Sequence, residues 1–457
     1  MNHIYFIGAG GIGMAALERY YLSKGKKVAG YDRTPTALTD ALIAEGVEIT
    51  FSPEADAIPA DFRDPADTLV IYTPAVPDDL PILRYFRDGG FEVIKRAKAL
   101  GLIARDSRSL CFAGTHGKTT TSSMAAHILN SGSIGCNAFL GGILKNYNSN
   151  FLLHPSSPFT VIEADEYDRS FHHLTPQIAV ITATDPDHLD IYGTEEAYLE
   201  SFAHFTELIR PGGTLIIHEG LKLKPRVAEG VKVYTYSRDK GDFHASYVRR
   251  GLGSITFDIV TPRGTIRNVN LGVPVEVNIE NAIAAAAAVC CTEAFEPEVI
   301  RSALSSYQGT KRRFESWLKE ENGRGRVIID DYAHHPEELR SSIASVKALY
   351  PGRHLTVAFQ PHLYTRTRDF ADDFADALSA ADSVILLDIY PAREEPIAGV
   401  TSEIIFKNVK SPDKTLIPKE KLVETLKNRN FDILLTAGAG DICNYLPEIV
   451  KSCSENA

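Results

Sequence analysis

The sequence predicts an α/β protein with three domains and mostly parallel sheets. Short apolar runs that are typical of buried strands alternate along the chain with segments of helical periodicity. Two of these runs lead into glycine-rich turns, and several later runs lead into clusters of polar residues. Because ligands bind at the carboxyl ends of the strands in open α/β sheets, these turns and clusters are the candidate functional residues.

Composition and charge narrow the class of protein. The chain has 457 residues, 44% hydrophobic and 23% charged, which is ordinary for a globular protein with several cores. Its 48 Lys and Arg against 59 Asp and Glu give a net charge of −11, so we expect no nucleic acid and no anionic membrane among its partners. The six cysteines have neither C-x-x-C nor zinc-ligand spacing. With no signal peptide and no apolar run long enough for membrane insertion, the expected location is cytoplasmic.

The first domain opens with a strand and a glycine-rich turn. The strand at residues 3–7 is followed by the spacing G-x-G-x-x-G at residues 8–13 and by a helical segment. A second strand, at residues 27–31, ends at Asp32, which completes the dinucleotide-binding fingerprint. An NAD-dependent oxidoreductase, a UDP-sugar-binding domain and a tight turn without a ligand all fit this pattern. Further strands are expected at residues 68–73 and 92–94, and a helix at residues 79–87. The domain is expected to span residues 1–106.

The second domain begins with a phosphate-loop pattern. A strand that starts at Ser109 leads into the turn at residues 114–119, and a helix follows over residues 121–129. Backbone N–H groups at such a helix start bind phosphate, a lysine reaches the outer phosphates, and a threonine hydroxyl ligates Mg²⁺. Phe112 stands where the full P-loop pattern has glycine, so an ordinary glycine turn with an incidental lysine is the alternative.

Acidic residues follow the next strands. Residues 137–150 are rich in glycine and asparagine and are expected to form a loop. The strand at residues 159–162 ends in the acidic run 163–168, which suits either a hard cation or a solvated turn. After the strand at residues 178–182, His188 lies between two acidic residues. It could be a metal ligand, an orienting group or a structural histidine.

The remainder of the second domain, which spans residues 107–314, contains two further candidate sites. Asn278 and Asn281 lie one helical turn apart at the start of an alanine-rich helix, where they could read the edge of a base or cap the helix. The basic residues 311–313 form either a phosphate clamp or a charged linker. Strands are expected at residues 215–217 and 231–234, and a β-hairpin at residues 251–269.

The third domain, residues 315–457, repeats the alternation of strands and helices. Polar clusters at residues 330–336, 360–368 and 438–441 each follow a strand. Three such clusters at one sheet edge argue for a site. The strands are expected at residues 327–329, 355–359, 383–389 and 433–436, and helices at residues 337–349 and 370–380.

Taken in order, these motifs resemble the Mur ligases, the ATP-dependent amino-acid ligases of peptidoglycan synthesis, over essentially the whole chain. The resemblance implies a Rossmann-like N-terminal domain for a UDP-sugar, a central P-loop-type ATPase domain with a mostly parallel sheet, and a Rossmann-like C-terminal domain for an amino acid. Within the family, residues 359–368 look like the members that join L-alanine to UDP-N-acetylmuramate through an acyl phosphate.

The resemblance also implies roles for single residues. ATP would be bound by Gly114, Thr115, His116, Gly117, Lys118, Thr119, Thr120, Asn278, Asn281, Arg313 and Asp331, and Mg²⁺ by Thr119, Glu163 and His188. The UDP-sugar would lie against Gly10, Gly11, Ile12 and Asp32, and L-alanine against Tyr332, His334 and Arg366. The catalytic set would be Lys118, Glu163, His188, His334 and Arg366, with Arg366 as the anchor because its fork matches a carboxylate.

Four residues depart from the family pattern, which often has Asn, His, Ser and Arg where this chain has Ala183, Val277, Tyr167 and Leu363. The nearest alternative function is a sister ligase that adds a whole tripeptide to the same UDP-sugar in cell-wall recycling. An NAD-dependent oxidoreductase and a nucleotide-binding regulator without catalysis are more distant alternatives. The expected assembly is a monomer or a homodimer.

Overall fold

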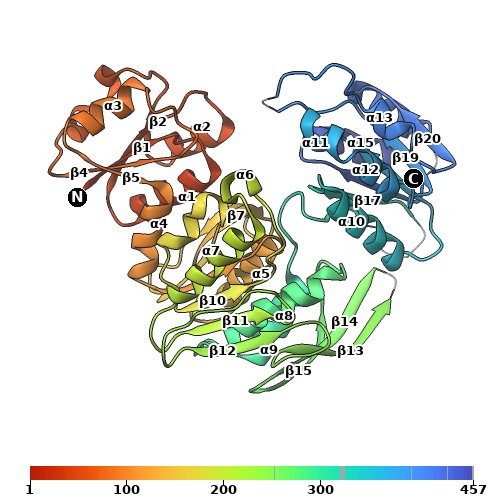
Figure 1. Cartoon of the computed structure of the whole chain (residues 1–457), viewed down its shortest axis with the longest axis horizontal. Coiled ribbons are helices and arrows are strands. Elements are labelled where there is room, and N and C mark those ends of the chain that lie inside the picture. Colours follow the sequence, from red (N-terminus) through yellow and green to blue (C-terminus); the bar gives the residue numbers. More distant parts are fainter. Residues whose placement is uncertain (252, 320–324, 393, 430, 455–457) are drawn as a thin grey trace. The chain divides into compact units, whose positions relative to one another are not determined.

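The computed structural model describes residues 1–251, 253–319, 325–392, 394–429 and 431–454. The chain divides into two compact units. The first comprises Met1–Ser246, Asp258–Val269 and Glu280–Leu304, and the second comprises Tyr247–Phe257, Asn270–Ile279 and Ser305–Ala457. Strands and helices alternate along the chain, as predicted (Figure 1). Within the described residues, no helix has both the length and the apolar character to span a bilayer.

The N-terminal part of the first unit is a five-stranded parallel sheet in the order β3-β2-β1-β4-β5. Its apolar runs are short and bounded by turns, which favours strands buried on both faces. The sheet confirms the predicted Rossmann-like arrangement, with β1 in the middle and the glycine turn at its carboxyl end. The elements are β1 (His3–Ile7), α1 (Ile12–Ser23), β2 (Lys27–Tyr31), α2 (Ala37–Ala44), β3 (Glu48–Thr50), β4 (Thr68–Tyr72), α3 (Pro81–Asp88), β5 (Glu92–Lys95) and α4 (Arg96–Arg105).

The central part of the first unit is a seven-stranded sheet in the order β12-β11-β10-β6-β9-β7-β8. All neighbouring strands are parallel except β7 and β8, which form an antiparallel pair at one edge. The elements are β6 (Arg108–Ala113), α5 (Lys118–Ser131), β7 (Asn137–Leu144), β8 (Ser149–Leu152), β9 (Phe159–Glu163), β10 (Ile178–Ile181), α6 (Leu189–Tyr192), α7 (Glu195–Glu207), β11 (Thr214–His218) and β12 (Lys232–Tyr236), with a 3₁₀ segment at Tyr167–His173.

The predicted loop over residues 137–150 is wrong, because β7 and β8 occupy most of it. Phe139, Leu140 and Leu144 are buried and anchor the hairpin, whereas the adjacent glycines suggested a loop. The pairing of β7 with β8 shifts register between Phe139 and Leu144, which is where Gly141 lies. A glycine inside a strand commonly marks such an irregularity or a close approach of another group.

A three-stranded sheet, β13-β14-β15, and two helices connect the central sheet with the C-terminal part. The predicted hairpin corresponds to β14 and β15 and turns at Pro262 and Arg263; its first residues include position 252, which lies outside the described residues. The elements are β13 (His244–Gly251), β14 (Ser254–Thr261), β15 (Gly264–Asn270), α8 (Val277–Cys290) and α9 (Pro297–Ser306).

The C-terminal part of the second unit is a six-stranded sheet in the order β16-β17-β21-β18-β19-β20, parallel except for β16. Alternate residues of its strands enter two apolar cores on opposite faces, Ile329 on one and Ile328 on the other. The elements are β16 (Glu315–Leu318), β17 (Val327–Asp331), α10 (Pro336–Leu349), β18 (Leu355–Phe359), α11 (Tyr364–Asp369), α12 (Ala371–Leu378), β19 (Ser383–Leu386), α13 (Glu403–Phe406), β20 (Asp413–Leu416), α14 (Leu422–Lys427), β21 (Ile433–Ala437) and α15 (Leu446–Ser454).

Candidate active site

The first glycine turn lies between β1 and α1 at the carboxyl edge of the five-stranded sheet. The Gly10 N–H donates to the Asp32 carboxylate at 2.6 Å, and a Cβ on Gly10 would lie 2.9 Å from the same carboxylate. Helix α1 begins after Gly11 without a side-chain cap, which leaves N–H groups of its first turn available to an anion. The structure therefore brings Gly10, Gly11, Ile12 and Asp32 together, with Asp32 orienting the turn.

The phosphate loop lies between β6 and α5 and is held in place from both sides. Gly114 and Gly117 have φ values of +140° and +84°, which a residue with a side chain rarely adopts. The Thr115 N–H donates to the Ala183 carbonyl at 3.0 Å, and the Thr115 hydroxyl lies 2.9 Å from the Tyr198 hydroxyl. Because these contacts tie the loop to the chain after β10 and to helix α7, its backbone N–H groups are preorganised for phosphate.

Lys118 is directed into this loop by a buried glutamate. Its ammonium donates to the Gly114 carbonyl at 2.7 Å and lies 2.8 Å from the carboxylate of Glu166, whose side chain is 1% exposed. Burial raises the pKa of the Glu166 carboxyl, whereas the Lys118 ammonium favours its ionised form. Glu166 belongs to the acidic run singled out in the sequence, but the sequence did not indicate that it would meet the lysine.

Thr119 and Glu163 form a pair of oxygen ligands next to the loop. The Thr119 hydroxyl donates to Glu163 at 2.9 Å, and the other Glu163 oxygen accepts from the Gly141 N–H at 2.8 Å. A hydroxyl and a carboxylate beside a phosphate loop suit Mg²⁺, which takes few protein ligands and keeps several waters. Among the described residues, no three His, Cys, Asp or Glu side chains converge as a metal-binding group.

Two further predicted site residues of the first unit are His188, expected to bind metal, and Asn281, expected to contact adenine. His188 has a φ of +52°, donates its backbone N–H to the Asp187 carboxylate at 2.7 Å, and packs edge-on against the Tyr167 ring at 5.2 Å. The Asn281 side chain accepts from the Thr121 hydroxyl at 3.2 Å and borders Gly117, so it lies at the phosphate loop. The roles of His188 in metal binding and of Asn281 at adenine therefore stay predictions.

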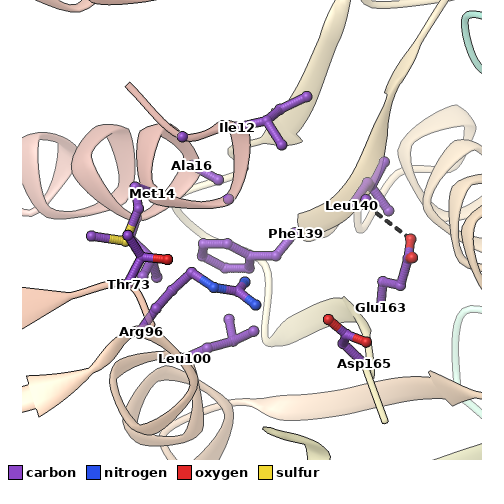
Figure 2. Close-up of a pocket in the computed structure, with 14 residues that line it drawn as sticks. Ile12, Met14, Ala16, Thr73, Arg96, Leu100, Phe139, Leu140, Glu163 and Asp165 are labelled. Atoms are coloured by element: carbon purple, nitrogen blue, oxygen red, sulfur yellow. Dashed lines mark hydrogen bonds between the residues drawn. The ribbon is translucent and has the colours of Figure 1, made fainter. Parts of the chain in front are cut away.

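A cavity of about 340 Å³ extends from the first glycine turn to Glu163 (Figure 2). Figure 2 shows the Arg96 guanidinium pointing into this cavity, and its Nη1 lies 3.0 Å from where a Cβ on Gly13 would be. Within the part of the chain that the structure describes, Arg96 makes no hydrogen bond or ion pair. An unpaired guanidinium beside a turn that is suited to phosphate makes Arg96 a candidate anion ligand, and it was not among the residues predicted from the sequence.

The second unit holds its own cluster at the carboxyl ends of β17 and β18. The guanidinium of Arg313 lies 5.4 Å from the centre of the Tyr332 ring, and the His334 ring packs edge-on against that ring at 5.2 Å. His334 Nδ1 lies 2.9 Å from the Tyr332 carbonyl and 3.2 Å from Glu338. Burial lowers the pKa of His334, and the field of Arg366 lowers it further. The predicted residues Arg313, Tyr332, His334 and Arg366 thus share one neighbourhood.

Three other residues of the second unit already have protein partners. Asp331 accepts from the Phe314 N–H at 3.2 Å and from the Ser342 hydroxyl, so its carboxylate already has protein partners. Asn278, also in this unit, donates to the Val273 carbonyl at 3.1 Å. His362 stacks on the Tyr390 ring at 5.8 Å, and burial together with the nearby His334 and Arg366 lowers its pKa to about 4. His362 was not among the predicted site residues.

Comparisons with known proteins agree with this arrangement. Family models match three successive segments: the Mur ligase family catalytic domain at residues 3–108, the Mur ligase middle domain at residues 112–289, and the Mur ligase glutamate ligase domain at residues 312–440. A UDP-N-acetylmuramate–L-alanine ligase of Phocaeicola vulgatus is 56% identical over 98% of this chain and 97% of its own. One from Parabacteroides distasonis is 58% identical over 98% of this chain and 96% of its own.

Solved structures show the same architecture. The UDP-N-acetylmuramate-alanine ligase of Thermotoga maritima matches all of this chain and all of its own, with a TM-score of 0.80 and 26% identity. A murein peptide ligase from Psychrobacter arcticus matches 99% of each chain with a TM-score of 0.66 and 21% identity, which indicates a shared fold.

The parallel sheets and the phosphate loop with its lysine define an α/β enzyme that uses a nucleotide. The three matched segments and the full-length relatives then establish that the chain belongs to the Mur ligase family. It is accordingly an ATP-dependent ligase.

Proposed function

We propose that this protein joins L-alanine to the carboxylate of UDP-N-acetylmuramate in peptidoglycan synthesis, with conversion of ATP to ADP and phosphate. The observation that carries the proposal is the identity of 56% and 58%, over 98% of the chain, to two relatives named for this reaction. The division of labour follows the predicted domains: residues 1–106 bind the UDP-sugar, residues 107–314 bind ATP, and residues 315–457 bind L-alanine.

The first step activates the acid. A carboxylate oxygen of UDP-N-acetylmuramate attacks the γ-phosphorus of ATP, the bond to the β–γ bridging oxygen breaks, and ADP leaves. The Lys118 ammonium, held at the loop by Glu166, stabilises negative charge on the transferred phosphoryl group. Thr119 and Glu163 would hold Mg²⁺, which supplies neutralisation of the phosphate oxygens when it is bound.

The second step forms the amide bond. The uncharged α-amine of L-alanine attacks the acyl carbon, phosphate leaves with the carboxylate oxygen that had attacked, and the amine loses a proton. Arg366 binds the alanine carboxylate, because within the described residues its guanidinium has no hydrogen bond or ion pair and a guanidinium matches a carboxylate. Tyr332 and His334 orient the amino acid beside it.

Arg96 adds a contact for the sugar nucleotide. Its guanidinium lies beside Gly13 in the cavity that the first glycine turn borders. We assign it to the diphosphate, where it would act with the first N–H groups of α1. Asn278, Asn281, Arg313 and Asp331 stay proposed ATP contacts, and His188 stays a proposed metal ligand.

The tripeptide ligase of cell-wall recycling is the second candidate, because its fold is the same. Incubation of the protein with ATP, Mg²⁺ and UDP-N-acetylmuramate, with either L-alanine or the tripeptide, separates the two when the products are identified by mass spectrometry. The proposal expects the alanyl product from the first mixture and very little product from the second. Efficient tripeptide addition would reassign the protein, and NAD binding without ATP turnover would favour the oxidoreductase. Cytoplasmic location and a monomeric or homodimeric state remain predictions.

A further inference from the structure

Asn150 is a buried residue that lies behind the substrate cavity rather than in its lining. It is the second residue of β8, in the central part of the first unit, and is 3% exposed. Its side-chain amide donates to the Ile12 carbonyl at 2.9 Å and to the Leu140 carbonyl at 3.4 Å. One amide group therefore ties the glycine turn of the N-terminal sheet to β7 of the central sheet.

The link continues from β7 to the phosphate loop. Leu140 is followed by Gly141, whose N–H donates to the Glu163 carboxylate at 2.8 Å, and Glu163 accepts from the Thr119 hydroxyl at 2.9 Å. Figure 2 shows Ile12, Leu140 and Glu163 around the same cavity, with the bond to Glu163 drawn as a dashed line. β7 pairs with β9 only through Asn137–Phe139, so beyond that point the Gly141 N–H is free to hold the carboxylate.

The packing around this link makes it stiff. Helix α1 packs against β7 and β8, and the Tyr20 ring on α1 lies 5.8 Å from the Phe139 ring on β7. A Cβ on Gly141 would collide with the Glu163 carboxylate, so the backbone of β7 passes close to that carboxylate at this residue. The hydrogen bonds from Asn150 to Ile12 and Leu140, and from Gly141 to Glu163, therefore form a contiguous path between the glycine turn and the phosphate loop.

We propose that Asn150 is a positioning residue that couples occupancy of the first glycine turn to the orientation of Glu163 at the phosphate loop. The proposal rests on the proposed function, because it assigns a sugar diphosphate to the turn and ATP with Mg²⁺ to the loop. Asn150 touches neither ligand in this arrangement; it acts through Ile12 and Leu140.

The test is the thermodynamic coupling between the two ligands. Calorimetric titrations measure the affinity for a non-hydrolysable ATP analogue with Mg²⁺, in the absence and presence of saturating UDP-N-acetylmuramate. The ratio of the two affinities is the coupling factor, and the reverse titration must give the same factor. We expect a factor of about 5 or more for the unmodified protein.

Two variants break the link at different points. Asn150→Asp keeps the size of the side chain but removes the NH₂ group that donates both hydrogen bonds. Gly141→Ala, at an exposed position, displaces the Glu163 carboxylate. Both are expected to lower the coupling factor to below about 2. The matched control is Asn137→Ala, which removes a second buried asparagine, on β7. The Asn137 side chain accepts from the His154 N–H at 3.0 Å. The control should retain the coupling, and thermal unfolding of each variant checks its fold.

The outcomes separate the inference from the function. Loss of coupling in Asn150→Asp and Gly141→Ala, with coupling kept in Asn137→Ala, supports the inference. Unchanged coupling in the first two variants, or a factor of about 1 in the unmodified protein, overturns the inference while the proposed function stands. Failure of the unmodified protein to bind UDP-N-acetylmuramate, with or without the ATP analogue, overturns both. If Asn150→Asp does not fold, Asn150→Ala, which also lacks the donating NH₂ group, takes its place.

Discussion

The ammonium of Lys118 lies 2.8 Å from the carboxylate of Glu166, and that carboxylate is 1% exposed. The ion pair fixes the lysine at the phosphate loop before a nucleotide arrives. A buried charge that loses its partner is costly, so Glu166 stabilises the position of the ammonium as well as its charge.

Replacement of Glu166 by Gln tests this relationship. The amide keeps one acceptor but loses the charge, and a hydrogen bond to a charged group contributes about 1.5–3 kcal/mol. We therefore expect kcat to fall about 10-fold or more, with the KM for L-alanine changed less than about 2-fold. Steady-state kinetics measure both constants.

The matched control is Asp168→Asn in the same acidic run. Asp168 pairs with Lys95 at 3.2 Å, but both side chains are nearly half exposed. An exposed ion pair is worth about 0–1 kcal/mol, so kcat should change little. Equal kcat values for the two variants would contradict a special role for Glu166.

Arg96→Met tests the diphosphate assignment. UDP-N-acetylglucosamine carries the same diphosphate as UDP-N-acetylmuramate but lacks the lactyl carboxylate. The affinities for both compounds should fall about 10-fold, because one charge-assisted contact is lost in each complex. Arg84→Met, on the exposed face of α3, is the control and should bind both as before. If Arg96→Met weakened the binding of UDP-N-acetylmuramate but not that of UDP-N-acetylglucosamine, the guanidinium would contact the lactyl carboxylate instead of the diphosphate.

Arg366 is expected to set the affinity for the amino acid. Arg366→Ala should raise the KM for L-alanine about 100-fold, and Arg366→Lys should raise it less because a lysine keeps the charge without the fork. The nearby Arg368 is exposed and paired with Asp369 at 2.7 Å, so Arg368→Ala serves as the control in the same kinetic assay. An unchanged KM in Arg366→Ala would remove this residue from the site.

His362 makes stability depend on pH. Burial lowers its pKa from 6.5 to about 4, so the folded protein keeps the ring neutral while the unfolded chain takes up a proton. The stability that comes from the neutral ring is fully present above pH 6.5 and is lost as the pH falls from 6.5 toward 4. Urea unfolding of His362→Gln should therefore show a weaker decline over this range than the unmodified chain. Parallel declines would show that another group is responsible.

Much of the fold could be predicted because each strand is a short apolar run with a polar turn at its end. The positions of Lys118, Thr119 and Glu163 followed from that rule, since parallel strands bring their carboxyl ends to one edge. The error at residues 137–150 has a local cause: Gly141 and Gly142 resemble a loop in sequence, but the chain uses them inside β7.

The residues that the sequence could not place owe their positions to long-range contacts. Asn150 meets Ile12 across 138 positions of sequence, and no local pattern predicts that hydrogen bond. Glu166 meets Lys118 across 48 positions of sequence, and the chain just after it has left-handed conformations at Asp168 and Arg169, with φ of 50° and 54°. These conformations are uncommon for residues other than glycine and are not readable from composition.

The central claim, acid activation by ATP followed by attack of L-alanine, is tested most directly by isotope transfer. UDP-N-acetylmuramate labelled with ¹⁸O in its carboxylate is incubated with the protein, ATP, Mg²⁺ and L-alanine, and the released phosphate is analysed by mass spectrometry. The account predicts that each phosphate carries one ¹⁸O atom and that its amount equals that of the alanyl product. Phosphate without ¹⁸O, released in step with that product, would contradict the acyl-phosphate route, and ¹⁸O-free phosphate with no product would contradict the ligase itself.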